Sequence, residues 1–536
     1  MALGLSTSNG IATVVVTTSG TAVSNLLPAA IESDLSCQPL IFITADRPKR
    51  LKNCGANQTV NQEAFLKPVC RKYIQGPEGG IHLLNSQNLK RLIDKAWSYS
   101  HKCPGPVHLN LFIEEPLHPL LSEQKEVWDG WEPPSFNKNG FDITFPIKPN
   151  LFNLSKFPIL NPYKPGLIIA GPFRGKPQDL DSFRTALKHL QDISSWPVFA
   201  DPLSGVSDEQ VGLIACWDFL LDLGIDEPKE DFQILRLGPM PSSKKLEDWL
   251  KSVSSKQVLI TEGESRCIDP LKLSDQYDRG LSDWVEKLNL PKKNIKNSIS
   301  LLSKEFLLRL REKDKLINDF LEKELYTSSE INEPVLAHLI PRIWPDLIPI
   351  MLSASSPIRD WISYAGLAPF SRRCFGFRGA SGIDGTLSLA MGLSKSLGKL
   401  LLVTGDLSLL HDSNGWLFSQ SDSPNLVVLL IDNHGGGIFK QLKIDGIYKG
   451  NFDHLFTMQQ FVDPVLLAAA HNIPCKQISC IEDLPFAFEW SMSIYGPVLI
   501  RVSTDSTKDS LFRIEIADRL RNHFHISLKK SSSHSI

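Results

Sequence analysis

Two long apolar runs in the last third of the chain, each followed at once by polar residues, constrain the fold more than any other feature. Residues 400–404 (LLLVT) precede Gly405-Asp406, and residues 426–432 (LVVLLID) precede Asn433. Runs of this kind are typical of strands buried on both faces of a parallel sheet. We therefore predict that Asp406 and Asn433 lie near each other at the carboxyl edge of an open α/β sheet, where such sheets bind ligands.

The chemistry of these residues suits a hard divalent cation. A carboxylate and an amide oxygen are ligands that Mg²⁺ accepts, and Mg²⁺ completes its shell with water and phosphate. Gly405 and three glycines at positions 435–437 would let the backbone approach a diphosphate closely. The alternative is an ordinary strand-turn pair that binds no ligand, and this motif alone leaves that alternative open.

The composition argues against several classes of function. A formal charge of −2, with 42% hydrophobic and 22% charged residues, indicates a globular protein that binds neither nucleic acid nor a membrane surface. No run reaches the roughly 18 apolar residues of a membrane span, and no secretion signal is visible. The nine cysteines form no CxxC pair, so we expect a cytoplasmic protein without disulfides or a zinc site.

Alternating strand-like and helix-like segments divide the 536 residues into three α/β units, each expected to hold a doubly wound parallel sheet. The first unit is predicted at 1–130, with strands at 12–17, 40–45 and 107–113 and a helix at 21–33. A linker at 131–165, a second unit at 166–325, a third at 330–520 and a tail at 521–536 would follow. The Ser-rich end of the tail, 529–536, is expected to lack regular structure.

The second unit is expected to close with a connecting helix at 297–325. Its apolar stripe would consist of Phe306, Leu307, Leu310 and Leu316.

A second cluster of candidate residues precedes a helix of small residues at 388–397. Residues 378–385 (RGASGIDG) would bring a glycine-rich turn to a ligand, with Arg378 pairing an anion and Ile383 packing against a ring. Ser355 and Arg359 add a hydroxyl and a second cation at a strand-to-helix turn. For the isolated motif, an ordinary helix start with a solvated arginine is the favoured alternative.

The first unit has candidates of its own. Asp46 and Arg47 end a strand, and Gln58 follows eleven residues later. The plain alternatives are a surface ion pair for Asp46-Arg47, which contributes little to stability, and a loop amide for Gln58.

Taken together and in this order, the motifs resemble those of the MenD family, the 2-succinyl-5-enolpyruvyl-6-hydroxy-3-cyclohexene-1-carboxylate synthases of the thiamine-diphosphate superfamily. The resemblance spans nearly the whole chain. In the superfamily signature, Leu407 replaces the last glycine of GDG and His434 replaces the second asparagine. The matching blocks are ALGL at 2–5, TSGTA at 18–22, TADRP at 44–48, GANQ at 55–58, GPVH at 105–108, RGASGIDG at 378–385, GDLS at 405–408 and NHGGGIF at 433–439.

This resemblance implies a fold, a reaction and an assembly. The three units would be a pyrimidine-binding domain, a central transhydrogenase-like domain and a diphosphate-binding domain. The reaction would join 2-oxoglutarate to isochorismate with loss of CO₂, in menaquinone or phylloquinone biosynthesis, using thiamine diphosphate and Mg²⁺ or Mn²⁺. In this superfamily two subunits share each cofactor, so a homodimer or homotetramer is implied.

The resemblance also implies roles for individual residues. Two substrates with four carboxylates need several cations, and arginine is the side chain that grips a carboxylate with two bonds. Lys245 stands where the family has an arginine, and a solvated helix face is the alternative for Lys244-Lys245. The metal ligands would be Asp406, Asn433 and the carbonyl of Gly435. The cofactor residues would be Ser19, Gly20, Thr21, Gln58, Ile383, Gly405, Asp406, Leu407, Ser408, Asn433, Gly435 and Ile438. The substrate residues would be Arg47, Gln58, Lys244, Lys245, Ser355, Arg359, Arg378, Phe439 and Leu442.

The chain departs from the family pattern at its start. The family's catalytic Glu, which hydrogen-bonds the aminopyrimidine ring, would lie upstream of Met1, and neither Glu32 nor Glu63 replaces it by position. We therefore assign no catalytic residue within the chain. We expect the 536 residues as written to bind the cofactor weakly and to show little synthase activity. A misassigned start codon is favoured over a true short form, and the first sheet would have an unpaired edge.

Two other functions stay open on the sequence alone. A different thiamine-diphosphate carboligase, similar to acetohydroxyacid synthase, would need neither three arginines nor RGASGIDG. A catalytically silent cofactor-binding protein is supported only by the missing start. An NAD-dependent dehydrogenase is disfavoured because no GxGxxG follows a strand in the first unit.

Overall fold

The computed structural model describes residues 1–115, 157–229, 231–291, 300–326, 330–419, 423–441 and 449–533, with a few isolated positions between them. The predicted linker therefore lies outside the described residues as far as position 156, and so does Leu442. The chain forms two compact units. Gly10–Lys156 and Ala2 make the smaller unit, and Met1, Leu3–Asn9 and Phe157–Ile536 make the larger one.

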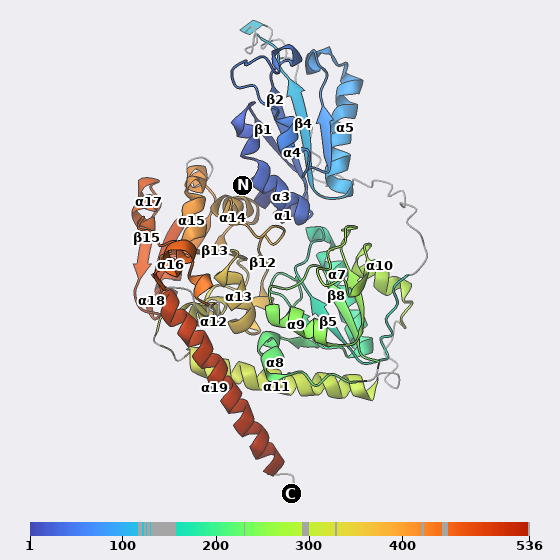
Figure 1. Ribbon diagram of the computed structural model, residues 1–536, viewed down its shortest axis with the longest axis vertical. Helices are drawn as coiled ribbons and strands as arrows, with labels where there is room; N and C mark the ends of the chain where they lie inside the picture. The colour runs from blue at the N-terminus through green and yellow to red at the C-terminus, as the bar shows by residue number, and fades with distance from the viewer. Residues whose placement is uncertain are drawn as a thin grey trace. The chain divides into compact units, whose positions relative to one another are not determined.

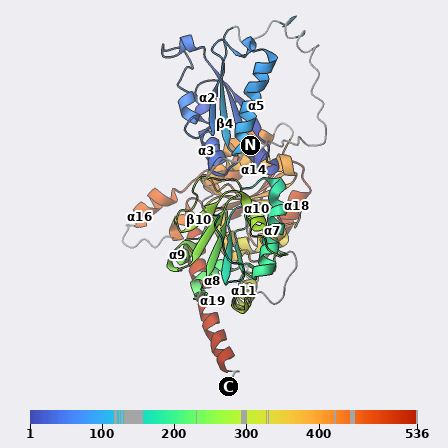
Figure 2. The same ribbon diagram turned by 90° about the vertical axis from the view of Figure 1, so that its right-hand side faces the viewer.

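The smaller unit is built on a four-stranded parallel sheet of order β1-β2-β4-β3. The strands are β1 (Thr13–Thr17), β2 (Leu40–Asp46), β3 (Lys72–Gln75) and β4 (Pro106–Phe112). The amphipathic helix α5 (Ser86–Lys102) packs along this sheet, and its Ala96 joins Val107 and Leu109 in a buried core (Figure 2). β1 is an edge strand, on which Val14 and Val16 are exposed.

The helix predicted at 21–33 is two helices, α2 (Thr21–Ser24) and α3 (Leu27–Leu35). The break has a local cause, because Pro28 lies in the first turn of α3. Proline has no N–H to donate to the preceding turn, so a helix can begin at Pro28 but cannot run through it. A further short helix, α4 (Glu63–Leu66), follows β2.

The larger unit contains two six-stranded sheets, in which every strand pairing is parallel, and one continuous hydrophobic core that spans both. Their orders are β10-β9-β8-β5-β6-β7 and β12-β11-β13-β14-β16-β15. The α/β class with three parallel sheets, predicted from the sequence, is confirmed, whereas the domain boundaries stay a prediction. The strands are β5 (Gly166–Ala170), β6 (Val198–Ala200), β7 (Leu213–Ile214), β8 (Gln233–Leu237), β9 (Lys256–Ile260), β10 (Ser274–Tyr277), β11 (Ile350–Leu352), β12 (Cys374–Phe375), β13 (Leu400–Gly405), β14 (Leu426–Asp432), β15 (Cys475–Ile478) and β16 (Val498–Ser503).

Helices cover both sheets of this unit. The small-residue helix predicted at 388–397 is α14, and α1 (Ala2–Asn9) packs on it so closely that a Cβ on Gly4 would lie 2.2 Å from the carbonyl oxygen of Leu389. The helices are α7 (Leu180–Ser194), α8 (Trp217–Leu223), α9 (Lys244–Ser252), α10 (Gly280–Lys287), α11 (Leu301–Tyr326), α12 (Glu333–Ile343), α13 (Ser356–Tyr364), α14 (Thr386–Leu397), α15 (Asp406–His411), α16 (Lys449–Phe452), α17 (Pro464–Ala470), α18 (Asp483–Met492) and α19 (Ser506–Ser533).

The connecting helix α11 shows one wrong prediction in its apolar stripe. Phe306, Leu307 and Leu310 are buried as predicted, but Leu316 is 39% exposed and Ile317 is fully buried instead. Seven residues make nearly two helical turns, so Ile317 returns to the face of Leu310, whereas Leu316 lies about 100° away.

The Ser-rich end at 529–536 was expected to lack regular structure, but α19 is helical as far as Ser533. Ile516, Leu520 and Phe524 are all buried. Their spacing of four residues forms a continuous apolar stripe that packs the first half of the helix. Figure 1 shows α19 crossing the C-terminal part of α11, where the rings of Phe320 and His523 lie 5.6 Å apart.

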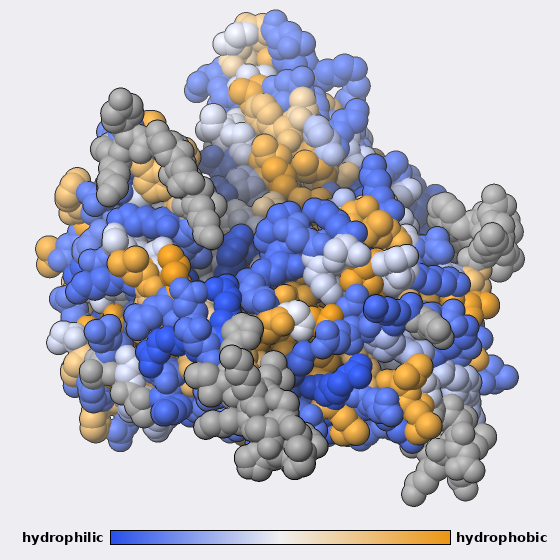
Figure 3. All heavy atoms as spheres, turned by 60° about the horizontal axis from the view of Figure 1, so that its bottom comes forward, coloured by the Kyte–Doolittle hydropathy of each residue, from blue (hydrophilic) through white to orange (hydrophobic). Residues whose placement is uncertain are grey.

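On the side that Figure 3 displays, hydrophobic residues are interspersed with hydrophilic ones. Within the described part of the chain, no helix has both the length and the apolar character needed to cross a bilayer.

Candidate functional site

A cavity of about 300 Å³ opens at the carboxyl ends of β11, β13 and β14. Strand β11 lies between β12 and β13. The chain passes from β11 to its neighbour β12 and then crosses over β11 to its other neighbour, β13. The carboxyl edge between β11 and β13 is therefore a topological switch point, where α/β sheets bind ligands. The cavity is lined by Glu333, Ala337, Ile340, Ala354, Ser355, Ser356, Pro357, Asp360, Trp361, Ile383, Val403, Gly405, Asp406, Leu407, Ser408, Ile431, Asn433, Gly435, Gly436, Gly437, Ile438 and Phe439.

Asp406 is the principal acid of the cavity wall. It begins α15 directly after β13, and its carboxylate accepts hydrogen bonds from the backbone N–H groups of Leu407 at 2.8 Å and Gly435 at 2.6 Å. Burial, with a further contribution from the charge of nearby Asp432, raises the pKa of Asp406 to about 7. Asp432 itself is paired with Arg501 at 2.7 Å. A cation at Asp406 would remove the cost of burying its charge.

Asn433 presents an unpaired acceptor from the neighbouring strand. Its Nδ2 donates to Glu333 Oε1 at 2.7 Å, while its buried Oδ1 meets no hydrogen-bond donor among the described residues. Buried acceptors without partners are rare and call for an explanation such as a ligand or ion. Gly435 completes the wall with φ of 143°, and a Cβ there would lie 2.3 Å from the carbonyl oxygen of Thr457.

A buried ionic cluster lies behind Asn433. Arg513 of α19 pairs with Glu333 and, through Nε at 2.9 Å and Nη2 at 2.6 Å, with both oxygens of Asp360. Asp509 accepts a hydrogen bond from the backbone N–H of Glu333 at 3.3 Å. Sequence reasoning missed this cluster. Only the helix start formed by Asn332, whose side chain caps α12, and Pro334 was visible in the sequence.

Most of the sequence-predicted residues of the third unit come together at this cavity. Ser355, Ile383, Leu407, Ser408, Ile438 and Phe439 all line it. Ser355 has φ of 78° and ψ of −135°, a conformation that normally requires glycine. Backbone strain of this kind is concentrated at binding sites, where the surrounding structure holds it in place.

Two predicted arginines do not line the cavity. Arg359 donates to the carbonyl oxygen of Ser355 at 2.9 Å, next to the cavity wall. Arg378 hydrogen-bonds the hydroxyl of Ser242, at the start of the segment that leads into α9.

The lysines of α9 are already neutralised by neighbouring acids. Lys244 pairs with Asp248 at 3.1 Å and is largely exposed, which fits the alternative of a solvated helix face. Lys245 pairs with Asp218 at 3.0 Å and Asp222 at 2.6 Å.

In the smaller unit, Ser19, Gly20 and Gln58 form one cluster. Gln58 Nε2 donates to the carbonyl oxygen of Ser19 at 3.0 Å, and a Cβ on Gly20, which has φ of 86°, would meet the Gln58 side chain at 2.9 Å. Thr21 begins α2 directly after this turn. Gln62, which sequence reasoning missed, accepts a hydrogen bond from the N–H of Gly20 at 3.1 Å.

The alternative of a surface ion pair between Asp46 and Arg47 is wrong. Asp46 is buried and pairs with Lys52 at 2.6 Å, and it accepts a hydrogen bond from Asn110 at 2.7 Å. Arg47 is half-exposed and makes no ion pair with any residue that the structure describes. Glu63 also pairs with Lys52, at 2.8 Å.

Relatives of this chain from Prochlorococcus marinus and Synechococcus carry the same name. No protein-family model matches the chain. A 2-succinyl-5-enolpyruvyl-6-hydroxy-3-cyclohexene-1-carboxylate synthase of Prochlorococcus marinus (strain NATL2A) is 50% identical over 523 residues, covering 97% of this chain and 87% of the relative. The synthase of strain MIT 9313 is 50% identical over 533 residues (98% and 90%), and that of Synechococcus sp. (strain CC9902) is 48% identical over 527 residues (97% and 90%). The chain belongs to this synthase family. The resemblance seen in the sequence is thereby confirmed, together with the transferase class.

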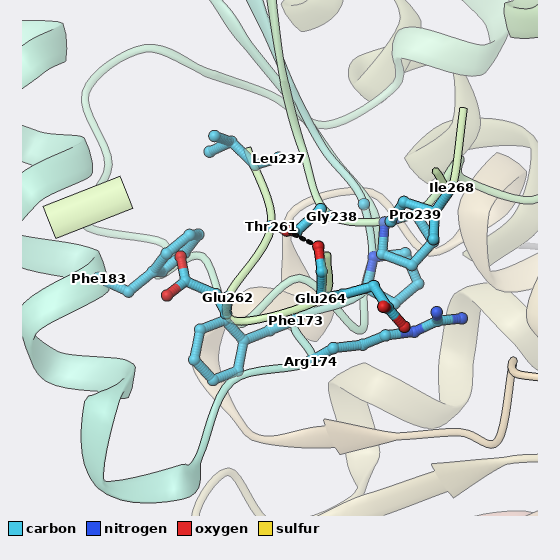
Figure 4. Close-up of a pocket in the computed structure, with 12 residues that line it drawn as sticks. Phe173, Arg174, Phe183, Leu237, Gly238, Pro239, Thr261, Glu262, Glu264 and Ile268 are labelled. Carbon is cyan, nitrogen blue, oxygen red and sulfur yellow. Dashed lines mark hydrogen bonds between the residues drawn. The ribbon is translucent and has the colours of Figure 1, made fainter. Parts of the chain in front are cut away.

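This member of the synthase family has a second switch point, between β5 and β8 of the central sheet, and it is closed. The space left there is only about 10 Å³. Figure 4 shows Phe173 and Pro239 among the side chains that fill it. The backbones after the two strands touch, since a Cβ on Gly171 would lie 1.6 Å from the carbonyl oxygen of Pro239. As far as the described residues show, the switch point at Asp406 has much more room for a ligand than this one.

Proposed function

We propose that the chain catalyses the decarboxylative joining of 2-oxoglutarate to isochorismate, which yields 2-succinyl-5-enolpyruvyl-6-hydroxy-3-cyclohexene-1-carboxylate and CO₂ for menaquinone or phylloquinone biosynthesis. The observation that carries this proposal is the cavity at the β11–β13 switch point. Its wall holds a buried carboxylate on Asp406 and an unpartnered amide oxygen on Asn433. These two groups lie in a member of the synthase family, at the place where such folds bind phosphate-bearing ligands.

The residues present fit thiamine diphosphate with Mg²⁺ or Mn²⁺. Asp406, Asn433 Oδ1 and the carbonyl of Gly435 would hold the cation. Among the described residues no group of three or more His, Cys, Asp or Glu could hold a metal. The protein would therefore supply one carboxylate, and the diphosphate and water would complete the shell, as Mg²⁺ prefers. When bound, thiamine diphosphate supplies the carbon nucleophile and the electron sink for decarboxylation.

The remaining cofactor residues have positioning roles in this proposal. Ile383 and Ile438 offer apolar surface to the cofactor rings and exclude water. Gly405 leaves the space beside Asp406 open for the diphosphate, with the backbone and hydroxyl of Ser408 and the backbone of Leu407 nearby. In the smaller unit, Ser19, Gly20, Thr21 and Gln58 are proposed to contact the cofactor as well.

The substrates are proposed to bind through cations and a small apolar surface. The guanidinium groups of Arg47, Arg359 and Arg378 would hold substrate carboxylates, and arginine suits this role because it can donate two parallel hydrogen bonds. Ser355 and Gln58 would add neutral hydrogen bonds, while Phe439 and Leu442 would contact apolar parts of the substrates. Lys244 and Lys245 would have to exchange their present acidic partners for substrate. A homodimer or homotetramer is the proposed assembly.

Substitution of Gly405 tests directly whether the diphosphate occupies the open space beside it. We expect Gly405→Ala to fold normally, because its φ of −85° suits any residue and nothing lies within 4 Å of the new Cβ. Its stability should be equal to that of the native chain or higher by roughly 0.4–1 kcal/mol. The methyl group would, however, occupy cavity space beside Asp406, so thiamine diphosphate affinity should fall at least tenfold. Thermal unfolding and cofactor titration by calorimetry measure the two effects.

Gly398→Ala is the matched control with the opposite pattern. Gly398 also has open space around it, but it ends α14 with φ of 88°, away from the cavity. Alanine is strained there by about 1–2 kcal/mol, so the control should lose stability and keep its cofactor affinity. If Gly405→Ala left cofactor affinity unaltered, the diphosphate could not lie against this turn.

The proposed reaction is tested by substrate choice, which does not depend on the absolute rate. The chain is supplied with thiamine diphosphate, Mg²⁺ and isochorismate, and ¹⁴CO₂ release is compared for 2-oxoglutarate and pyruvate, each labelled at C1. We expect CO₂ from 2-oxoglutarate and selective protection from thermal unfolding by 2-oxoglutarate. Preference for pyruvate would instead indicate an enzyme similar to acetohydroxyacid synthase. Absence of hydrogen exchange at C2 of the bound cofactor would indicate a silent cofactor-binding protein.

A further inference from the structure

The amide of Asn433 can bind a cation in only one of its two orientations. The carboxamide has an oxygen that can ligate a cation and an NH₂ group that would repel it. Nothing in the asparagine itself selects between the two, because the groups are nearly equal in size. A neighbouring side chain must therefore fix the orientation, and Glu333 is the residue in contact with it.

Glu333 forces one orientation by its chemistry. An ionised carboxylate only accepts hydrogen bonds, so the Asn433 group that faces Glu333 Oε1 at 2.7 Å must be the NH₂. The oxygen then faces the other way. It is buried there, and no donor among the described residues reaches it. Glu333 also lines the cavity, so this contact lies in the wall itself.

Glu333 is in turn held by α19 at two points. Arg513 grips the second oxygen of its carboxylate, and Asp509 accepts a hydrogen bond from its backbone N–H at 3.3 Å. Asp509 and Arg513 are four residues apart, which places them on one face of the helix. The same Arg513 grips Asp360, another residue of the cavity wall, with two hydrogen bonds. Figure 1 shows α19 passing α12, the helix that Glu333 begins.

From these contacts we infer that Glu333, clamped by Arg513 and Asp509 of α19, is the positioning residue that turns the Asn433 oxygen toward the divalent cation. This inference rests on the proposed cation site and adds to it a residue that is not itself a ligand of the cation. The C-terminal helix thereby becomes part of the metal site, although it contributes no ligand. Groups that orient metal ligands typically alter metal affinity about 10- to 100-fold when they are removed.

A charge-swap pair of variants tests the orientation. Glu333→Gln keeps the shape but can offer its own NH₂ to Asn433, so the affinity for Mn²⁺ should fall about 10- to 100-fold. Asn433→Asp alone should also weaken binding, because it places a carboxylate against Glu333. In the double variant the NH₂ of the introduced glutamine would donate to the new carboxylate, whose two oxygens are equivalent as ligands. Affinity should then return to within a few-fold of the native value, and independent effects would instead multiply.

The link to α19 has its own variant and its own control. Arg513→Lys keeps the charge but loses the forked contact to Glu333 and Asp360, so the Mn²⁺ affinity should fall several-fold. Arg519→Lys alters the same helix six residues on, at a half-exposed arginine that pairs with Glu324, and should leave the Mn²⁺ affinity unchanged.

The measurement is a titration of each full-length variant with Mn²⁺ at fixed thiamine diphosphate, with the free ion quantified by EPR and folding checked by circular dichroism. Equal Mn²⁺ affinity in native chain, Glu333→Gln and Arg513→Lys would overturn the inference while leaving the cation site intact. So would a double variant weaker than both single ones. Failure of the native chain to bind Mn²⁺ with the cofactor would remove the cation site and this inference together. A loss of melting temperature with unaltered Mn²⁺ affinity would show a purely structural role, which also contradicts the inference.

Discussion

Replacing Asp406 with asparagine is expected to abolish metal-dependent binding of thiamine diphosphate while making the ligand-free protein more stable at pH 8. The two effects have one cause. The carboxylate is buried, and burial together with Asp432 raises its pKa to about 7, so ionising it in the folded chain is costly. A bound cation offsets that cost. Asparagine avoids the cost but offers the cation no charge.

The sign of the pH dependence follows from the raised pKa. Between the ordinary value of 3.8 and about 7, the folded chain holds a proton on Asp406 that the unfolded chain has lost. Stability of the ligand-free protein therefore falls as the pH rises through this window, by up to roughly 4 kcal/mol for this group. In Asp406→Asn this contribution to the pH dependence of stability is absent. Its NH₂ would oppose one of the two backbone N–H donors, so the net gain at pH 8 should be roughly 1–3 kcal/mol.

Thermal unfolding from pH 4 to 8, with and without cofactor and Mg²⁺, tests this reversal. Without ligands Asp406→Asn should melt higher than the native chain at pH 8, and the gap should close toward pH 4. With Mg²⁺ saturating and thiamine diphosphate at about 100 times its dissociation constant, the cofactor should stabilise the native chain by about 2.7 kcal/mol and the variant not at all. Asp314→Asn is the matched control, because burial raises the pKa of that carboxyl to about 6 far from the cavity. The control should keep cofactor binding. Equal ligand stabilisation in Asp406→Asn would refute the ligand assignment.

The strand ends of the third unit could be placed from the sequence because parallel strands share their carboxyl edge. The runs at 400–404 and 426–432 are long, apolar and bounded by polar residues, and they form the adjacent strands β13 and β14. Adjacency of these strands brings Asp406 and Asn433 to one cavity. The residues around each strand end were therefore enough to predict this part of the site, because the site lies where the strands end.

Contacts between distant segments could not be read from the sequence in the same way. Glu333 meets Asn433 across 100 residues and Arg513 across 180. Each residue looks ordinary in its own segment, an acid at a helix start and a basic residue on a helix. Only packing of α12 against α19 gives them a shared role. The helix of the tail was missed for a related reason, because its buried residues are few and spaced four apart within a polar segment.

Two wrong predictions concern single helices: the apolar stripe of α11 and the helix break at Pro28. The stripe of α11 was misplaced by one residue, since Ile317 lies seven residues, nearly two full turns, after Leu310, whereas Leu316 lies about 100° off that face. The break before Pro28 was overlooked because the segment as a whole is helix-forming. The alternative of a surface ion pair at Asp46 failed because its position at the end of a central strand buries it.

The second large effect concerns a buried ion pair beside the β8 strand, and we expect Asp269→Ala to destabilise the protein by about 3–5 kcal/mol. Asp269 Oδ1 pairs with Arg236 Nη1 at 2.7 Å, and both side chains are 2% exposed. Its carboxylate also accepts hydrogen bonds from the N–H groups of Leu271 at 3.1 Å, Leu273 at 2.8 Å and Ser274 at 3.0 Å. Alanine would leave these donors and a buried guanidinium without their partner.

Asp231→Ala is the matched control for this variant. Asp231 pairs with Lys164 at the same distance of 2.7 Å, but its side chain is 63% exposed. An exposed pair contributes about 0–1 kcal/mol, so chemical denaturation should separate the two variants by several kcal/mol. Similar losses in both would mean that burial of the Arg236–Asp269 pair does not set its contribution.

The pH dependence of this pair should run opposite to that of Asp406. Burial alone would raise the pKa of Asp269, but hydrogen bonds from Ser274 and Arg236 and the charge of Arg236 outweigh it and lower the pKa to about 2. The stabilisation is therefore complete above the ordinary value of 3.8 and is lost as the pH falls through 2, a difference of roughly 2.5 kcal/mol. Native chain and Asp269→Asn, compared by denaturation at pH 5 and pH 2.5, should differ in stability far more at pH 5. Asparagine also places an NH₂ group against one of the N–H donors, but that cost is the same at both pH values. A constant difference would therefore show that the carboxylate charge contributes nothing.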